Sequence, residues 1–79
     1  MTPGQCRAAR SWLGWSTRET AERAGVARAT LVRFEGGFDV RYSSMDKIRK
    51  TYESAGIEFQ GRTHVVRRGE EGTSRKRKQ

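Results

Sequence analysis

Apolar residues recur at helical spacing along the first 56 positions, and capping residues and glycines interrupt this pattern at short intervals. The pattern predicts four helices, at residues 3–13, 17–24, 27–35 and 43–55. Polar pairs with the spacing of a capping box mark three helix starts, namely Thr2 with Gln5, Ser16 with Glu19, and Ser43 with Asp46. We therefore expect a domain of four short helices over residues 1–56.

After Gly56 the spacing changes to the alternation of a β-strand. Residues 57–59 alternate apolar and polar side chains, residues 63–67 are rich in β-branched side chains, and turn-forming residues separate the two runs. These features predict a β-hairpin over residues 57–67, inside an extension that covers 57–68. The expected fold class is mainly α, with four helices followed by a short C-terminal hairpin.

The chain is small and strongly basic. Its 79 residues carry a formal net charge of +8, and only 33% of them are hydrophobic. We therefore expect either that part of the chain is unfolded or that a second copy supplies extra burial. Residues 69–79 are rich in glycine, serine, glutamate and basic residues, which is typical of a disordered tail. The helical part is basic as well, and this favours a polyanion as the partner.

Other classes of function lack support in the residues. Cys6 is the single cysteine, and together with His64 it falls short of the four ligands that a structural zinc site needs. We expect no metal, cofactor or small-molecule ligand. Paired carboxylates in apolar surroundings are absent, which argues against an enzyme. No apolar run approaches the roughly 18 residues of a membrane span, and the expected location is the cytoplasm.

Residues 16–35 carry the most specific pattern. Two short predicted helices flank a turn at residues 24–26, where Gly25 suits a left-handed backbone. Leu31 and Phe34 face inward on the second helix. Its opposite face carries Arg28, Ala29, Val32 and Arg33. A short helix with arginines on its outer face, braced by another helix across a sharp turn, has the geometry that enters the major groove of DNA.

The block from Ser16 to Glu35 resembles the helix-turn-helix of the Cro and phage-repressor (Xre-type) family of small bacterial transcription regulators. The resemblance extends from Thr2 to about Phe59, and its motifs are Leu13-Gly14-Trp15-Ser16, Ala24-Gly25-Val26 and Thr30-Leu31-Val32-Arg33-Phe34-Glu35. It implies a Cro-like repressor that binds DNA operators in the bacterial cytoplasm, associated with the nucleoid. The chain departs from the family pattern at Thr17, Thr20 and Ala27, where Gln, Leu, and Ser or Thr are usual.

Specific roles follow for the residues of this block. Arg28 is the best candidate for a bidentate contact to guanine, Ala29 and Val32 for contacts to thymine methyl groups, and Arg33 for a base or a flanking phosphate. The alternative is that these arginines are ordinary solvated surface. The expected phosphate contacts lie at the starts of the second and fourth helices, at Ser16, Thr17, Arg18, Arg41, Tyr42, Ser43 and Ser44.

The expected working unit is a homodimer on double-stranded DNA. One such helix reads too few base pairs to find a site in a genome, and relatives bind two half-sites about one helical turn apart. The apolar residues after the fourth helix are the candidate dimer surface, namely Ile57, Phe59, Val65 and Val66. The alternative is that these side chains fold back onto the helices and that dimerisation occurs only on DNA.

Two further interpretations stay open. The helix-turn-helix can serve as the scaffold of a protein-interaction module, as in an antitoxin or antiactivator, and Ala29, Val32 and the partly exposed Trp12 are compatible with this. A basic chain can also bind nucleic acid or membranes without specificity through its tail.

Overall fold

The computed structural model describes residues 1–67, and the tail predicted for residues 69–79 lies outside them. Within the described part the chain forms four helices and two strands, in the order α1 (Pro3–Leu13), α2 (Thr17–Ala24), α3 (Arg28–Glu35), α4 (Tyr42–Ser54), β1 (Ile57–Gln60) and β2 (His64–Arg67). The two strands form an antiparallel hairpin. The fold is mainly α, as predicted.

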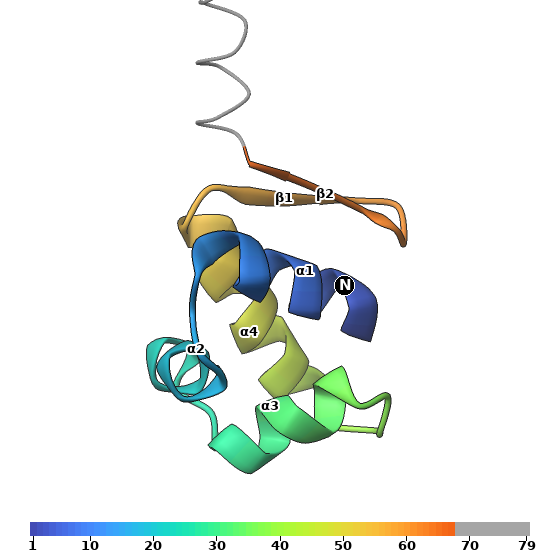
Figure 1. Ribbon diagram of the computed structural model, residues 1–79. Coiled ribbons are helices and arrows are strands. Elements are labelled where there is room, and N and C mark those ends of the chain that lie inside the picture. Colours follow the sequence, from blue (N-terminus) through green and yellow to red (C-terminus); the bar gives the residue numbers. More distant parts are fainter. Residues whose placement is uncertain (68–79) are drawn as a thin grey trace, which may run out of the picture.

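The helices surround α4, which runs through the middle of the molecule (Figure 1). The hairpin lies at one end, against α1 and α4, and α3 lies at the opposite end. The short helix α2 lies at the side and contacts both α3 and α4. No other element covers the outer face of α3 within residues 1–67, and the residues on it are exposed.

The core draws one or more buried side chains from each helix and from β1. Its fully buried larger members are Tyr52, Leu31, Ile48, Ile57, Thr20 and Cys6. The Tyr52 ring stacks on Trp15 with centroids 6.0 Å apart and meets Phe59 edge-on at 6.1 Å. Each large apolar side chain that leaves water contributes about 1.5–3 kcal/mol, so a few residues hold this small domain together.

Caps and glycines set most helix ends where the sequence predicts them. At α1 the Thr2 hydroxyl accepts from the Gln5 amide at 3.1 Å, and the Gln5 side chain accepts from the Thr2 amide at 2.9 Å, which is the predicted capping box. Gly14 and Gly25 both have φ of 72°, which is the left-handed region that closes α1 and α2.

The second predicted capping box is only half made. The Ser16 hydroxyl accepts from the Glu19 amide at 3.0 Å. The Glu19 carboxylate, however, pairs with Arg23 one turn later, with Arg23 Nη2 2.9 Å from Glu19 Oε2. A charged partner at i+4 offers this carboxylate a stronger hydrogen bond than a neutral amide does.

The third predicted capping box is wrong. α4 begins at Tyr42, one residue earlier than Ser43, and no side chain caps it. Asp46, the expected capping partner, instead pairs with Arg49 and with Lys50, whose Nζ lies 3.1 Å away. Tyr42 therefore belongs to the first turn of α4 rather than to the preceding loop.

The hairpin has the predicted extent but turns its apolar residues inward. Phe59 pairs with Val65, so both lie on the same face as Ile57, and this face packs on the core. Ile57 has no exposed surface in a single copy and is therefore not available to a second one. Among the candidate dimer residues, Val66 alone pairs with Glu58 on the opposite face.

Hydrogen bonds tie the hairpin to the start of α1. The side-chain amide of Gln5 donates to the carbonyls of Gly61 and His64, both at 3.0 Å, and the Thr2 hydroxyl donates to the carbonyl of Arg62 at 3.2 Å. The capping pair of α1 thus also anchors the hairpin turn, so the apolar face of the hairpin is directed toward the helices.

Candidate nucleic-acid interface

The turn between α2 and α3 has the tight geometry that its sequence predicts. The amides of Gly25 and Val26 both donate to the carbonyl of Ala21, at 2.9 and 3.1 Å. Ala21 is 3% exposed, and its small side chain lets α2 lie close to the core. Thr20, where the resembled family has leucine, is fully buried, and its hydroxyl donates to the Ser16 carbonyl at 2.9 Å. The polar group therefore adds no unpaired donor to the core.

The two faces of α3 separate as predicted. Leu31 and Phe34 are buried, whereas the outer face exposes Arg28, Ala29, Val32 and Arg33. Ala27 precedes the helix and provides no side-chain cap, as its small side chain predicts. The exposed face is therefore partly apolar and partly cationic, without an acidic residue on it.

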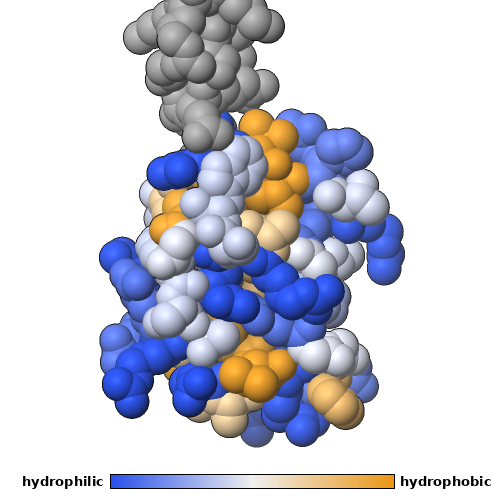
Figure 2. All heavy atoms as spheres, in the orientation of Figure 1, coloured by the Kyte–Doolittle hydropathy of each residue, from blue (hydrophilic) through white to orange (hydrophobic). Residues whose placement is uncertain are grey.

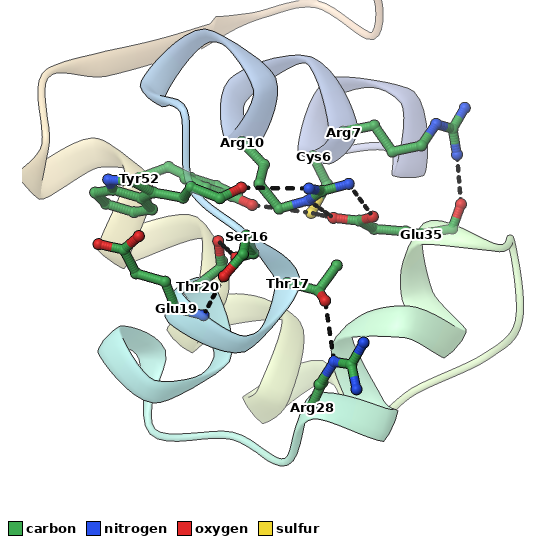
Figure 3. A network of polar contacts seen from close by, with 11 residues as sticks. Cys6, Arg7, Arg10, Ser16, Thr17, Glu19, Thr20, Arg28, Glu35 and Tyr52 are labelled. Carbon is green, nitrogen blue, oxygen red and sulfur yellow. Dashed lines mark hydrogen bonds and ion pairs between the residues drawn. The ribbon is translucent and has the colours of Figure 1, made fainter.

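Arg28 is held in place from the neighbouring helix. Its Nε donates to the hydroxyl oxygen of Thr17 at 3.0 Å (Figure 3). This bond spans from the first residue of α3 to the first residue of α2. Within residues 1–67 the two terminal nitrogens of Arg28 have no partner. The guanidinium is thus oriented by one edge and keeps a fork of donors for a ligand.

Arg33 has a different support, which the sequence reasoning missed. Its guanidinium carbon lies 5.3 Å from the centroid of the Phe38 ring, and this ring is 61% exposed. The available signal was an aromatic residue directly after Gly36-Gly37, in a loop that otherwise has no need of one.

The candidate phosphate contacts gather at the two ends of α3. At the first end, Ser16, Thr17 and Arg18 start α2 beside Arg28. The Ser16 hydroxyl already accepts from the Glu19 amide, so within residues 1–67 the amides of Ser16, Thr17 and Arg18 are the ones that remain for an anion.

At the other end of α3, an open hollow of about 620 Å³ lies beside the start of α4. It is lined by Thr30, Arg33, Asp39, Val40, Arg41 and Ser44. Tyr42 is 71% exposed next to it, and Ser43 is exposed as well. The structure therefore brings Arg33 of α3 beside Arg41 and Ser44, which the sequence placed at the start of the fourth helix.

A partly buried ion pair fixes the end of α3 against α1. Arg10 donates to both carboxylate oxygens of Glu35, at 2.8 and 3.0 Å, and Arg7 donates to the Glu35 backbone carbonyl (Figure 3). The hydrogen bond to Glu35 raises the pKa of Arg10 above its ordinary value. The carboxylate is 8% exposed, so the pair is a structural brace rather than a surface contact.

The thiol of Cys6 completes this network. Its Sγ lies 3.5 Å from both Glu35 Oε2 and the Tyr52 hydroxyl. Burial raises the pKa of Cys6 to about 12, so the thiol is neutral and unreactive at ordinary pH. Burial also raises the pKa of Tyr52. These groups are internal, and none of them faces the outer side of α3.

The surface and the remaining chemistry add three observations. The view in Figure 2 is mostly hydrophilic, with small, separate hydrophobic patches. Within residues 1–67, no helix has the length and apolar character that crossing a bilayer requires, and no cluster of three potential metal-ligating side chains occurs.

No protein-family model and no curated protein matches the chain.

Proposed function

We propose that this protein is a sequence-specific DNA-binding transcriptional regulator that places α3 in the major groove of double-stranded DNA. One observation carries the proposal: the exposed guanidinium of Arg28 is held at Nε by Thr17, and its two outer nitrogens stay unpaired within the described residues. Two parallel N–H donors match the O6 and N7 acceptors of guanine, which is the commonest specific contact to a base.

The rest of α3 fits this role. Ala29 and Val32 follow Arg28 on the same exposed face, and Val32 is 47% exposed. Small apolar side chains at these positions can meet thymine methyl groups. In this proposal Arg28 identifies a G·C pair, while Ala29 and Val32 favour neighbouring A·T pairs.

The phosphate contacts flank the base contacts. Ser16, Thr17 and Arg18 would bind the backbone at one end of α3, where the positive end of the α2 dipole lies. Arg41, Tyr42, Ser43 and Ser44 would bind it at the other end, at the uncapped start of α4. Two such contacts set the register of α3 in the groove without reading sequence themselves.

Replacing Arg28 provides the direct test. A pool of random duplexes is selected with the parent protein, and affinities are measured on the enriched sequence. Arg28→Ala is expected to weaken binding by about 5- to 150-fold, which corresponds to roughly 1–3 kcal/mol, and to relax the preference at one G·C pair. Arg28→Lys should lose most of this preference as well, because lysine has no planar fork.

Arg62→Ala is the matched control, because it removes the same charge from the exposed hairpin turn, far from α3. It should leave the preferred sequence unchanged. If the parent enriches no sequence, or if Arg28→Ala keeps the full ratio of specific to non-specific binding, α3 does not read DNA, and the protein-interaction alternative gains support.

We further propose that two copies act together on two half-sites. Because the apolar face of the hairpin packs on its own helices, the hairpin offers a second copy mainly its strand edges and Val66. Sedimentation of the parent with its enriched duplex should give two proteins per duplex. Val66→Asp, which spares the buried face, should weaken this assembly only if the hairpin joins the copies. One protein per duplex would contradict the dimer.

A further inference from the structure

α3 ends in a turn that folds the chain back over its last residues. Gly37 has φ of 88°, its amide donates to the carbonyl of Phe34 at 3.0 Å, and the amide of Phe38 donates to the carbonyl of Arg33 at 3.0 Å. These two bonds form a Schellman motif, in which the residue after the left-handed glycine contacts the residue five positions before it. The motif thereby brings Phe38 against Arg33.

The Phe38 ring remains at the surface after this turn. It is 61% exposed, and it packs over Gly36, with ring carbons 3.4 and 3.5 Å from the place of a β-carbon on that glycine. The ring therefore contributes little to the core, and its location needs another explanation.

The side chain of Arg33 supplies that explanation. Its guanidinium carbon lies 5.3 Å from the ring centroid, inside the range of roughly 6 Å for a cation–π contact. Such a contact uses the face of the ring and leaves the N–H donors of the arginine available. Within residues 1–67 these donors have no hydrogen-bond or ion-pair partner.

The position of Arg33 indicates which ligand it serves. It lines the hollow at the start of α4 together with Arg41 and Ser44, and it lies at the end of α3 opposite to Arg28. Arg41 and Ser44 are candidate phosphate contacts. Asp39 also lines the hollow, so two arginines against one carboxylate leave it a net positive charge, and the guanidinium donors with the hydroxyl suit a phosphate of the DNA backbone.

We infer that Phe38 is a positioning residue for Arg33, which it holds in this hollow in the orientation that binds a backbone phosphate. The inference rests on the proposed DNA-binding function. A free arginine loses rotamer freedom when DNA orders it, and a ring that orders the side chain beforehand reduces this cost. The contact to phosphate carries no sequence information, so Phe38 raises affinity for any duplex.

The test compares Phe38→Leu with Phe38→Tyr on a short duplex of arbitrary sequence and on the enriched duplex. Leucine keeps an apolar contact to the turn but has no π face, whereas tyrosine keeps both. Phe38→Leu is expected to weaken binding to both duplexes by about two- to fivefold, and Phe38→Tyr should bind as the parent does. Thermal unfolding of each variant shows whether the turn itself is intact.

A second background isolates the coupling to Arg33. Arg33→Ala alone should lower the slope of log affinity against log salt concentration by the amount expected for about one phosphate contact. When Phe38→Leu is added to Arg33→Ala, we expect no additional loss of affinity. Equal losses in both backgrounds would show that Phe38 acts only on the fold, and this would overturn the inference. A loss confined to one base pair would overturn the assignment to phosphate.

These results separate the inference from the function on which it rests. If the parent enriches a preferred sequence but Phe38→Leu causes the same loss of affinity in the parent and in Arg33→Ala, the inference alone is refuted. A parent that binds neither duplex refutes both.

Discussion

Arg10→Ala is expected to lower the free energy of unfolding by about 3–5 kcal/mol, the largest effect of any polar substitution that we predict. Arg10 donates to both oxygens of the Glu35 carboxylate, which is 8% exposed. Removing the arginine leaves a buried negative charge without its partner beside the Cys6 thiol. This loss is a large share of the free energy of unfolding of a domain, which is roughly 5–15 kcal/mol. Urea denaturation of the parent and the variant measures the difference in the free energy of unfolding.

An exposed ion pair provides the control. Lys50 Nζ lies 3.1 Å from Asp46 Oδ2, and the lysine side chain is 68% exposed, so Lys50→Ala should cost less than about 1 kcal/mol. The double variant Arg10→Met/Glu35→Leu should be more stable than Arg10→Ala, because it removes both charges. Equal stabilities for Arg10→Ala and Lys50→Ala would show that the buried pair is not a brace.

Raising the pH from 9 to 12 is expected to destabilise the fold. In the unfolded chain the Cys6 thiol ionises near its ordinary pKa of 9.0, whereas in the fold burial raises this pKa to about 12. The contribution is fully present below pH 9. Above it the unfolded state binds fewer protons, so the free energy of unfolding falls by about 1.4 kcal/mol per pH unit, or about 4 kcal/mol in total.

The surroundings of the thiol agree with this direction. The carboxylate of Glu35 raises the pKa of Cys6 further, while the hydrogen bond with Tyr52 and the charge of Arg10 lower it, and burial outweighs both. The pKa of Tyr52 is itself raised from 10.0, so this tyrosine adds to the loss of stability in the upper part of the pH range.

Cys6→Ser tests the assignment under reducing conditions. Serine is similar in size and does not ionise in this range, so the decline in stability between pH 9 and 10 should be much smaller than in the parent. Denaturation with urea at a series of pH values measures it. If Cys6→Ser shows the same decline as the parent, other groups cause the alkaline unfolding.

The sequence by itself predicted the features that depend on local interactions. Thr2 with Gln5, and the glycines Gly14 and Gly25, mark helix ends because their hydrogen bonds and backbone angles involve residues only a few positions apart. The face of α3 that is exposed also followed from spacing alone, since Leu31 and Phe34 lie on the other side. The extent of the hairpin followed from its β-branched run in the same way.

Tertiary structure decided which polar partners each side chain has. Arg10 meets Glu35, and Arg28 meets Thr17, across separate helices. These contacts depend on which helices pack side by side, and sequence spacing alone does not show that. The pairing of Asp46 with Arg49 and Lys50 rather than with Ser43 is instead a local competition inside α4, among partners that are all within one turn.

Tertiary structure also decided which way the hairpin faces and where the arginines of α3 rest. Alternation shows that Ile57 and Phe59 share a face, but the packing of Phe59 on Tyr52 and the anchoring of the turn by Gln5 direct that face toward the helices. Arg28 rests on Thr17 because α3 packs beside the start of α2, whereas the contact of Phe38 with Arg33 is local to the turn at Gly37. Side-chain periodicity and caps are local, whereas burial, pairing and the orientation of a guanidinium depend on residues far apart along the chain.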